Sequence, residues 1–196
     1  MNISTGGSLK NTIEDRIAPA LRFASEMCSL NMGSMNFSCH PLVQRPDARR
    51  FHREKDYVVA SNTYIFRNTF RDIANVASQL GPLGTKFEHE CYDVGHHCNL
   101  RFCTDQGMFK APIFSQFIFG ILGGIGPEVD NLVFMKRTAD RLFGDDSRWS
   151  VLGAGGAQLG LATTASQIGG SARSAASSKI SAAKSPLLMR RARFWG

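Results

Sequence analysis

The chain contains 196 residues, of which 43% are hydrophobic, 10% aromatic and 20% charged, and its net charge at pH 7 is +7. This composition is typical of one globular domain with a substantial core, and it excludes collagen, a coiled coil and wholesale disorder. No apolar run reaches the roughly 18 to 20 residues of a membrane-spanning helix, and residues 1–7 lack the apolar core of a signal peptide. We therefore expect a cytoplasmic protein with no membrane partner.

Strand-like and helix-like stretches alternate along residues 1–170. The expected strands are 1–4, 27–35, 85–93, 113–120 and 149–153, and the expected helices are 11–23, 68–80, 97–105, 127–143 and 158–168. Short apolar strands that are each followed by a helix predict a parallel sheet covered by helices. These units fit either an open doubly wound sheet or an incomplete (β/α)8 barrel, because a complete barrel needs about 200 to 250 residues.

Two stretches depart from this alternation. Residues 36–64 form a long connection, and a loop of this length inside a compact domain is typically functional or a lid. Residues 171–196 hold six basic residues and no acidic residue, whereas the rest of the chain is nearly neutral and has no stripe of aromatic and basic residues. We therefore expect no nucleic-acid partner. The sequence predicts a domain over 1–170 and a basic Ser/Ala-rich tail over 171–196 that is disordered or read out of frame.

Polar residues stand at the ends of the first two expected strands, where parallel α/β folds build their sites. The first turn consists of Ser4, Thr5, Gly6 and Gly7. Its hydroxyls and unhindered backbone amides could hold an anion, or they could do no more than cap the following helix. Ser29 and Asn31 alternate along the second strand and therefore share one of its faces.

Glu88 and Glu90 also share one face of a strand, while Phe87 and Cys91 point to the other face. Two carboxylates turned towards the interior are costly unless they are paired or used. The two glutamates are therefore either part of a functional site or a salt-bridged structural pair.

Other motifs carry less chemistry. The glycine-rich turns at 123–127 and 153–156 match neither a dinucleotide-binding fingerprint nor a phosphate-binding loop. Asp93, His96, His97, Cys98 and Cys103 lie close together, but their spacing matches no zinc pattern, so we interpret the histidines as solvated or helix-capping. The five cysteines are an odd number without a secretion signal, which predicts free thiols.

Five stretches, in order, resemble the β-keto acid cleavage enzyme family, whose founding activity is 3-keto-5-aminohexanoate cleavage. They read NISTGG (2–7), EMCSLNMGS (26–34), FEHECYDVGH (87–96), FGILGGIG (119–126) and WSVLGAG (149–155). The resemblance implies an incomplete (β/α)8 TIM-type barrel in which about five of the eight βα units are present. It also implies a homo-oligomer for the intact family.

The resemblance further implies an acyltransferase that converts a β-keto acid and acetyl-CoA into acetoacetate and a new acyl-CoA, with Zn²⁺ polarising the keto oxygen. Carried over by motif, the turn formed by Ser4 or Thr5 with Gly6 and Gly7 would hold the substrate carboxylate. Ser29 and Asn31 would line the site. Glu90, or Glu88 as the second choice, would contact the variable end of the substrate.

The chain departs from the family pattern at the metal. The family binds zinc through a His-x-His on an early strand and a glutamate in a last-strand motif that follows a Gly-Gly pair. Here no His-x-His is present, and Gly169-Gly170 precede Ser171-Ala172-Arg173. We therefore expect no metal ligands in this chain and no activity from it alone. The alternatives are a degenerate non-catalytic fragment, or a protein whose basic tail binds nucleic acid or a membrane.

Overall fold

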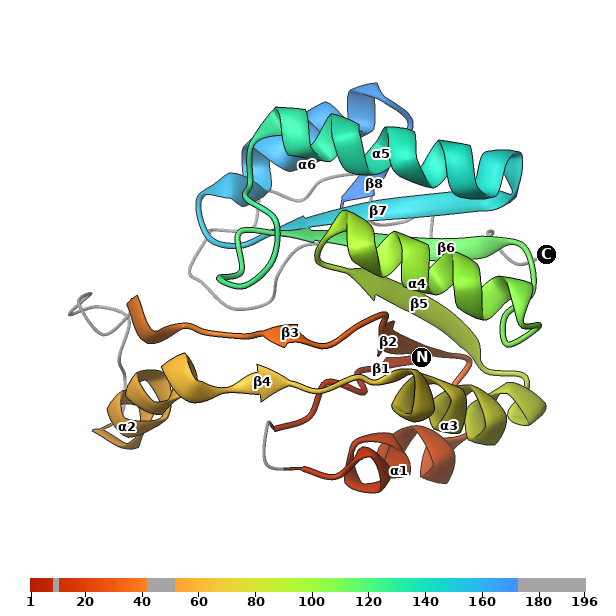
Figure 1. Ribbon diagram of the computed structural model, residues 1–196, viewed down its shortest axis with the longest axis horizontal. Helices are drawn as coiled ribbons and strands as arrows, with labels where there is room; N and C mark the ends of the chain where they lie inside the picture. Colours follow the sequence, from red (N-terminus) through yellow and green to blue (C-terminus); the bar gives the residue numbers. More distant parts are fainter. Residues whose placement is uncertain (9–10, 42–51, 173–196) are drawn as a thin grey trace.

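The computed structural model describes residues 1–8, 11–41 and 52–172. Within them, the main sheet contains β1 (Asn2–Ile3), β2 (Met27–Asn31), β5 (Lys86–Cys91), β6 (Ile113–Phe119), β7 (Ser147–Gly153) and β8 (Ser171–Ala172). Its helices are α1 (Ile13–Phe23), α3 (Phe70–Leu80), α4 (Val94–Asp105), α5 (Val129–Phe143) and α6 (Ala157–Gln167). Short 3-10 turns lie at Ser61–Thr63, Gly81–Leu83 and Gly144–Asp146. Figure 1 shows this arrangement.

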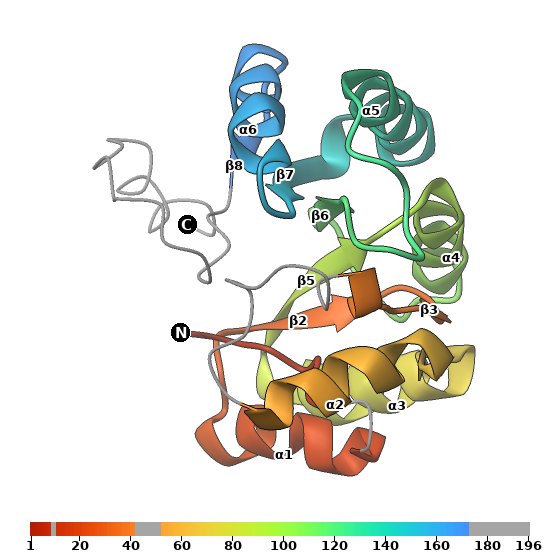
Figure 2. The ribbon, with the colours of Figure 1, turned by 90° about the vertical axis from the view of Figure 1, so that its left-hand side faces the viewer.

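The strands lie in the order β1-β2-β5-β6-β7-β8, and every neighbouring pair is parallel. Spatial order thus follows chain order, whereas a doubly wound sheet reverses direction at a switch point. The strands curve into an arc with the helices on its outer side (Figure 2). The predicted α/β fold with five βα units is confirmed, and its arrangement is consistent with part of a TIM-type barrel.

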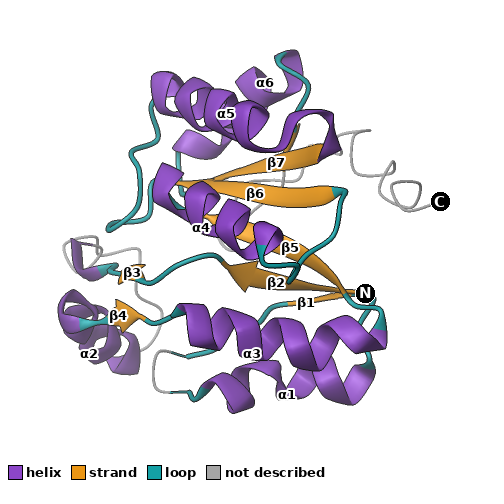
Figure 3. Cartoon of the chain, turned by 45° about the vertical axis from the view of Figure 1, so that its right-hand side comes forward, coloured by secondary structure: helices purple, strands orange, loops and turns teal. Residues whose placement is uncertain are grey.

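The connection between β2 and α3 is more structured than predicted. The second strand ends at Asn31 rather than at residue 35, and Met35–Asn36 instead forms β3, which pairs antiparallel with β4 (Ile65–Phe66). The backbone leaves the sheet where Asn99 Nδ2 donates to the Met32 carbonyl at 2.8 Å. Helix α2 (His52–Ala60) lies within the predicted loop. The β3–β4 ribbon forms a separate two-stranded sheet, with α2 beside it (Figure 3).

Strand β8 falls within the stretch predicted as tail, where Ser171 and Ala172 pair with Ser150 and Val151. The sheet therefore continues two residues beyond the expected boundary at residue 170. Residues 173–196 lie outside the described residues, so disorder and a changed reading frame both stay predictions.

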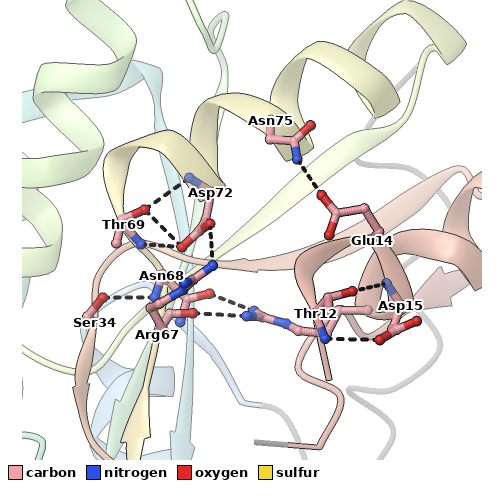
Figure 4. A network of polar contacts seen from close by, with 10 residues as sticks. Thr12, Glu14, Asp15, Ser34, Arg67, Asn68, Thr69, Asp72 and Asn75 are labelled. Carbon is pink, nitrogen blue, oxygen red and sulfur yellow. Dashed lines mark hydrogen bonds and ion pairs between the residues drawn. The ribbon is translucent and has the colours of Figure 1, made fainter. Parts of the chain in front are cut away.

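The outer face of the sheet carries the main core. Outward-pointing strand residues pack under the helices, and one buried aliphatic residue from each helix meets them: Cys28, Leu30, Phe117 and Val151 from the sheet, and Ile17, Ile73, Leu100, Leu132 and Leu161 from the helices. Burial of each such aliphatic side chain contributes about 1.5 to 3 kcal/mol. Helices α1 and α3 begin where Thr12 and Thr69 cap them in capping boxes with Asp15 and Asp72 (Figure 4).

All five cysteines are free, as predicted. In the described part of the chain, no helix is long and apolar enough to cross a bilayer.

Candidate functional site

A row of polar residues crosses the inner face of the sheet. Strand register aligns Asn31 with Glu90, Glu90 with Gln116, Gln116 with Ser150, and Ser150 with Ser171. Aligned residues of parallel strands point to the same side, so these side chains form what we call the inner polar row. Asn31, Gln116 and Ser150 are each no more than 1% exposed. A buried polar row of this kind is costly unless each group is bonded or serves a ligand.

Glu88 lies one row below and anchors the sheet. Its carboxylate is fully buried and accepts hydrogen bonds from Asn2 Nδ2 at 2.8 Å and from Gln116 Nε2 at 3.2 Å. Gln116 Nε2 also lies 3.3 Å from the Ser150 hydroxyl. These contacts connect β1, β5, β6 and β7. Glu88 is therefore placed to hold strands together rather than to meet a substrate.

Glu90 has a different environment, nearer the carboxyl ends of the strands. It is half-buried, and the Tyr92 hydroxyl donates a hydrogen bond to it. Burial first, and then the negative charge and hydrogen bond of Glu90, raise the pKa of Tyr92 far above its usual value. Tyr92 therefore keeps its proton and stays a donor. The two glutamates therefore have different surroundings, and both the functional and the structural interpretation of them stay predictions.

An apolar cluster covers the inner polar row on the carboxyl side. It comprises Met35 and Phe66 of the ribbon together with Tyr92 and Ile118, and Phe37, Ile121 and Leu152 pack against it. Tyr92, Ile118 and Leu152 each lie two residues beyond a member of the inner polar row and thus on the same face. We call this group the roof cluster. The roof cluster therefore places apolar side chains next to the inner polar row, on the side towards the carboxyl ends of the strands.

The turn after β1 is held to β2 by Thr5. The Thr5 hydroxyl donates to the Ser29 carbonyl at 2.6 Å, and the Thr5 amide donates to Ser29 Oγ at 3.3 Å. Both residues are buried, so their polar groups are used in binding the two strands together. Ser4 is exposed, and its Oγ accepts from the Gly6 amide at 3.2 Å.

Arg16 of α1 holds the same turn from the other side, and no sequence signal singled it out. Its Nε donates to the Thr5 carbonyl at 2.7 Å, and its two terminal nitrogens donate to the Arg67 carbonyl at 2.9 Å and to Asn68 Oδ1 at 2.6 Å. A side chain at Gly7 would strike Arg16, since a Cβ at that position would lie 2.6 Å from Arg16 Cγ. Figure 4 shows Arg67 and Asn68 within this network of polar contacts.

The two neighbouring histidines are buried, so the solvated interpretation is wrong, whereas His96 bonds to a backbone amide just before its helix, as a capping residue does. Helix α4 begins at Val94, so both lie in its first turn and point back to the sheet. His96 Nδ1 accepts from the Tyr92 amide at 3.2 Å, and the fully buried His97 ring packs on Phe117. Burial lowers the pKa of His97 to about 4.

Across residues 1–8, 11–41 and 52–172, no three His, Cys, Asp or Glu side chains come together in a way that could hold a metal ion. The residues described therefore do not fit the zinc that the resemblance implies.

The inner polar row runs from the last residue of β2 to the middle of β6 and β7, and the stretches of sequence that supply it lie within a match to a known family. The profile of the beta-keto acid cleavage enzyme family matches residues 1–175. The chain belongs to this family. The predicted resemblance is confirmed.

Three curated relatives share the match. The chain is 45% identical over 173 residues to 3,5-dioxohexanoate:acetyl-CoA acetone transferase of Paraburkholderia graminis, covering 88% of this chain and 56% of that protein. It is 27% identical over 170 residues to 3-keto-5-aminohexanoate cleavage enzyme of Fusobacterium nucleatum, a match that covers 87% of this chain and 52% of that protein. It is 24% identical over 121 residues to 3-dehydrocarnitine:acetyl-CoA trimethylamine transferase of Rhizobium meliloti, a match that covers 62% of this chain and 33% of that protein. The chain thus spans about half the length of the first of these relatives.

Proposed function

We propose that this chain carries the β-keto acid site of an acyltransferase that exchanges acyl groups with acetyl-CoA, giving acetoacetate and a new acyl-CoA. The observation that carries the proposal is the inner polar row, which lies on strands of the matched family and ends beneath the roof cluster. The 45% identity to an enzyme named for 3,5-dioxohexanoate supports a β-keto acid with an uncharged far end as the substrate class.

In this proposal the turn after β1 holds the substrate carboxylate. Ser4 and Gly7 are exposed there, so the backbone of the turn, in which Gly7 has a positive φ of 63°, is open to an anion. Thr5 and Ser29 act by fixing the turn to β2, because their hydrogen bonds are made to each other. Glu90 lies on β5, the strand next to β2, and contacts the far end of the substrate. Glu88 joins the strands through its hydrogen bonds to Asn2 and Gln116.

Zinc has no part in these roles. A bound divalent metal would polarise the keto oxygen of the substrate, but the described residues do not form such a site. We expect no turnover from these 196 residues alone. The cytoplasmic location and the homo-oligomer stay predictions, and residues 173–196, on which the nucleic-acid or membrane alternative rests, lie outside the described residues.

A chimera tests the proposal. Residues 1–175 of this chain would replace the matching segment of the Paraburkholderia graminis enzyme, and acetoacetate release from 3,5-dioxohexanoate and acetyl-CoA would be followed. We expect the chimera to turn over, and Glu90→Gln to lower kcat/KM by about 10-fold or more. Glu14→Gln, at an exposed glutamate of α1, is the matched control and should have no effect. A folded chimera without activity would contradict the proposal.

A further inference from the structure

Arg16 of α1 has a buried guanidinium group whose hydrogen bonds join two separate parts of the site. The residue is 7% exposed, and each of its three side-chain nitrogens donates to a different acceptor: the Thr5 carbonyl, the Arg67 carbonyl and Asn68 Oδ1. Burying a charge is costly unless its donors are bonded, and the planar guanidinium fork fixes its acceptors relative to one another. One rigid group therefore sets the position of Thr5 relative to the segment that follows β4.

The bonds of Asn68 extend this connection to both strands of the β3–β4 ribbon. Strand β4 ends two residues before Asn68, whose backbone amide donates to Ser34 Oγ at 2.8 Å (Figure 4). Its Nδ2 donates to the Gly33 carbonyl at 3.4 Å. Ser34 immediately precedes β3, which begins at Met35. Arg16 and Asn68 together therefore hold both strands of the ribbon at its base.

The same ribbon carries two buried members of the roof cluster. Met35 of β3 and Phe66 of β4 both belong to it. The Phe66 ring also lies against the guanidinium group, with Arg16 Cζ 4.9 Å from the ring centroid, a cation–π contact. Thr5, which accepts from Arg16 Nε, belongs to the turn after β1. The position of the roof cluster relative to that turn therefore depends on Arg16.

We propose that Arg16 is a positioning residue that fixes the roof cluster relative to the turn after β1, so that a substrate held at the turn packs its apolar part against the roof. This inference rests on the proposed function, since it takes that turn as the carboxylate site. Arg16 acts through Thr5 and the ribbon, because each of its nitrogens is bonded within the chain. Its replacement should weaken the binding of the apolar part of a ligand more than that of the carboxylate.

Two saturated fatty acids measure these two contributions separately. Butanoate and hexanoate carry the same carboxylate, differ by two methylene groups and lack a keto group, so neither can undergo acyl exchange. Binding of each to the full chain would be measured by NMR titration of the backbone amide signals. We expect hexanoate to bind the wild-type chain about tenfold more tightly, because burying two further methylene groups strengthens binding by about that factor.

Two variants alter the connection at its two ends. Arg16→Lys keeps the positive charge, but a compact ammonium group does not span the three acceptors of a planar fork. The ratio of hexanoate to butanoate affinity should fall in this variant from about tenfold to about twofold. Asn68→Ala keeps the bond from Arg16 to the Thr5 carbonyl and removes the connection to the ribbon. It should lower the ratio while leaving the affinity for butanoate unchanged, and it serves as the second variant if the first does not fold.

Two control variants separate positioning from a general loss of stability. Arg22→Lys makes the same chemical change at an exposed residue of the same helix. Leu132→Ala removes a fully buried side chain of α5 and lowers stability without changing a bond of Arg16. Partial unfolding weakens the apparent binding of both acids by the same factor, so both controls should keep the wild-type ratio. A ratio that falls equally in Leu132→Ala would overturn the inference.

Two other results would also overturn it: equal affinities of the two acids for the wild-type chain, or an unchanged ratio in both Arg16→Lys and Asn68→Ala. Absence of any binding would contradict the carboxylate site at the turn, and with it both this inference and that part of the proposed function. The outcome is distinct from that of the chimera. A ratio that falls in both variants, together with an inactive chimera, would refute acyl exchange and leave the role of Arg16 standing.

Discussion

Two buried histidines should make the stability of this chain depend strongly on pH between 7.5 and 5. His89 and His97 lie on the outer face of the sheet and in helix α4, and they are 3% and 0% exposed. Burial lowers the pKa of each to about 4, against an ordinary value of 6.5. His97 has no hydrogen-bond partner at either ring nitrogen among the described residues, so nothing there compensates a positive charge.

The sign follows from where the protons bind. Between pH 6.5 and 4 the unfolded chain binds protons at these two positions and the folded chain does not, so the free energy of unfolding falls as the pH falls. Integrated from pH 7.5 to 5, each histidine removes about 2 kcal/mol of stability, and the pair removes about 4 kcal/mol. The buried His96, whose pKa is also lowered by burial, changes stability in the same direction.

Urea unfolding followed by circular dichroism at several pH values between 7.5 and 5 measures this loss. The range ends at pH 5 because carboxylates such as Asp15, Asp72 and Glu26, whose pKa values are lowered, lose their contribution only in more acidic solution. His97→Leu and His89→Leu should each remove about 2 kcal/mol of the pH-dependent loss, whatever they do to stability at pH 7.5.

Leu100→Val is the matched control, because it alters a fully buried residue of the same helix without changing a titrating group. It should lower stability by about 1 kcal/mol at every pH and leave the slope unchanged. The reasoning is refuted if wild-type stability is the same at pH 7.5 and 5, or if both histidine variants retain the full slope.

Three further predictions concern hydrogen bonds and close contacts. Glu88→Gln and Gln116→Glu should each lower the free energy of unfolding by about 1 to 3 kcal/mol, because the first places two amide donors together and the second two carboxylates. The double variant restores a donor and an acceptor, so a double-mutant cycle measured by urea unfolding should show that it recovers most of the loss. Arg16→Met should lower the free energy of unfolding by about 3 kcal/mol, and Arg16→Lys should lower it less, because only the lysine keeps a charged hydrogen-bond donor. Equal midpoints of urea unfolding for the two variants would contradict this. Gly123→Ala should speed amide hydrogen exchange in the β3–β4 ribbon, because the φ of Gly123 is +106° and a Cβ there would lie 1.8 Å from the Asn36 carbonyl oxygen. Unchanged exchange at residues 35–38 would contradict this prediction.

The residues that the sequence proposed for the site divide into three groups in the structure. Glu88, Thr5 and Ser29 are engaged in bonds between strands, and the exposed Ser4 accepts from the Gly6 amide. Asn31 and Glu90 are aligned across neighbouring strands. Alternation along a strand predicts that two glutamates share a face, but it contains no information on which of them meets an amide from another strand. That difference depends on register between strands, which is a non-local property.

Arg16 and Gln116 were missed for the same reason. Each is ordinary in its own stretch of sequence: an arginine in an amphipathic helix and a glutamine in an apolar strand. Their importance comes from partners 11 to 52 residues away for Arg16, and 28 and 34 residues away for Gln116. The histidines of α4 were misread because their orientation depends on the residue at which that helix begins.

The sequence by itself determined the βα alternation, the strand faces and the family, because these depend on local periodicity and on short motifs. Tertiary structure decided that the sheet follows chain order, that residues 32–36 leave it to form a ribbon, and that an apolar roof lies over a polar row. These features arise where separate strands and loops pack together. Burial and register then decide which polar groups are bonded within the fold and which, like the Asn31 amide, have no partner among the described residues.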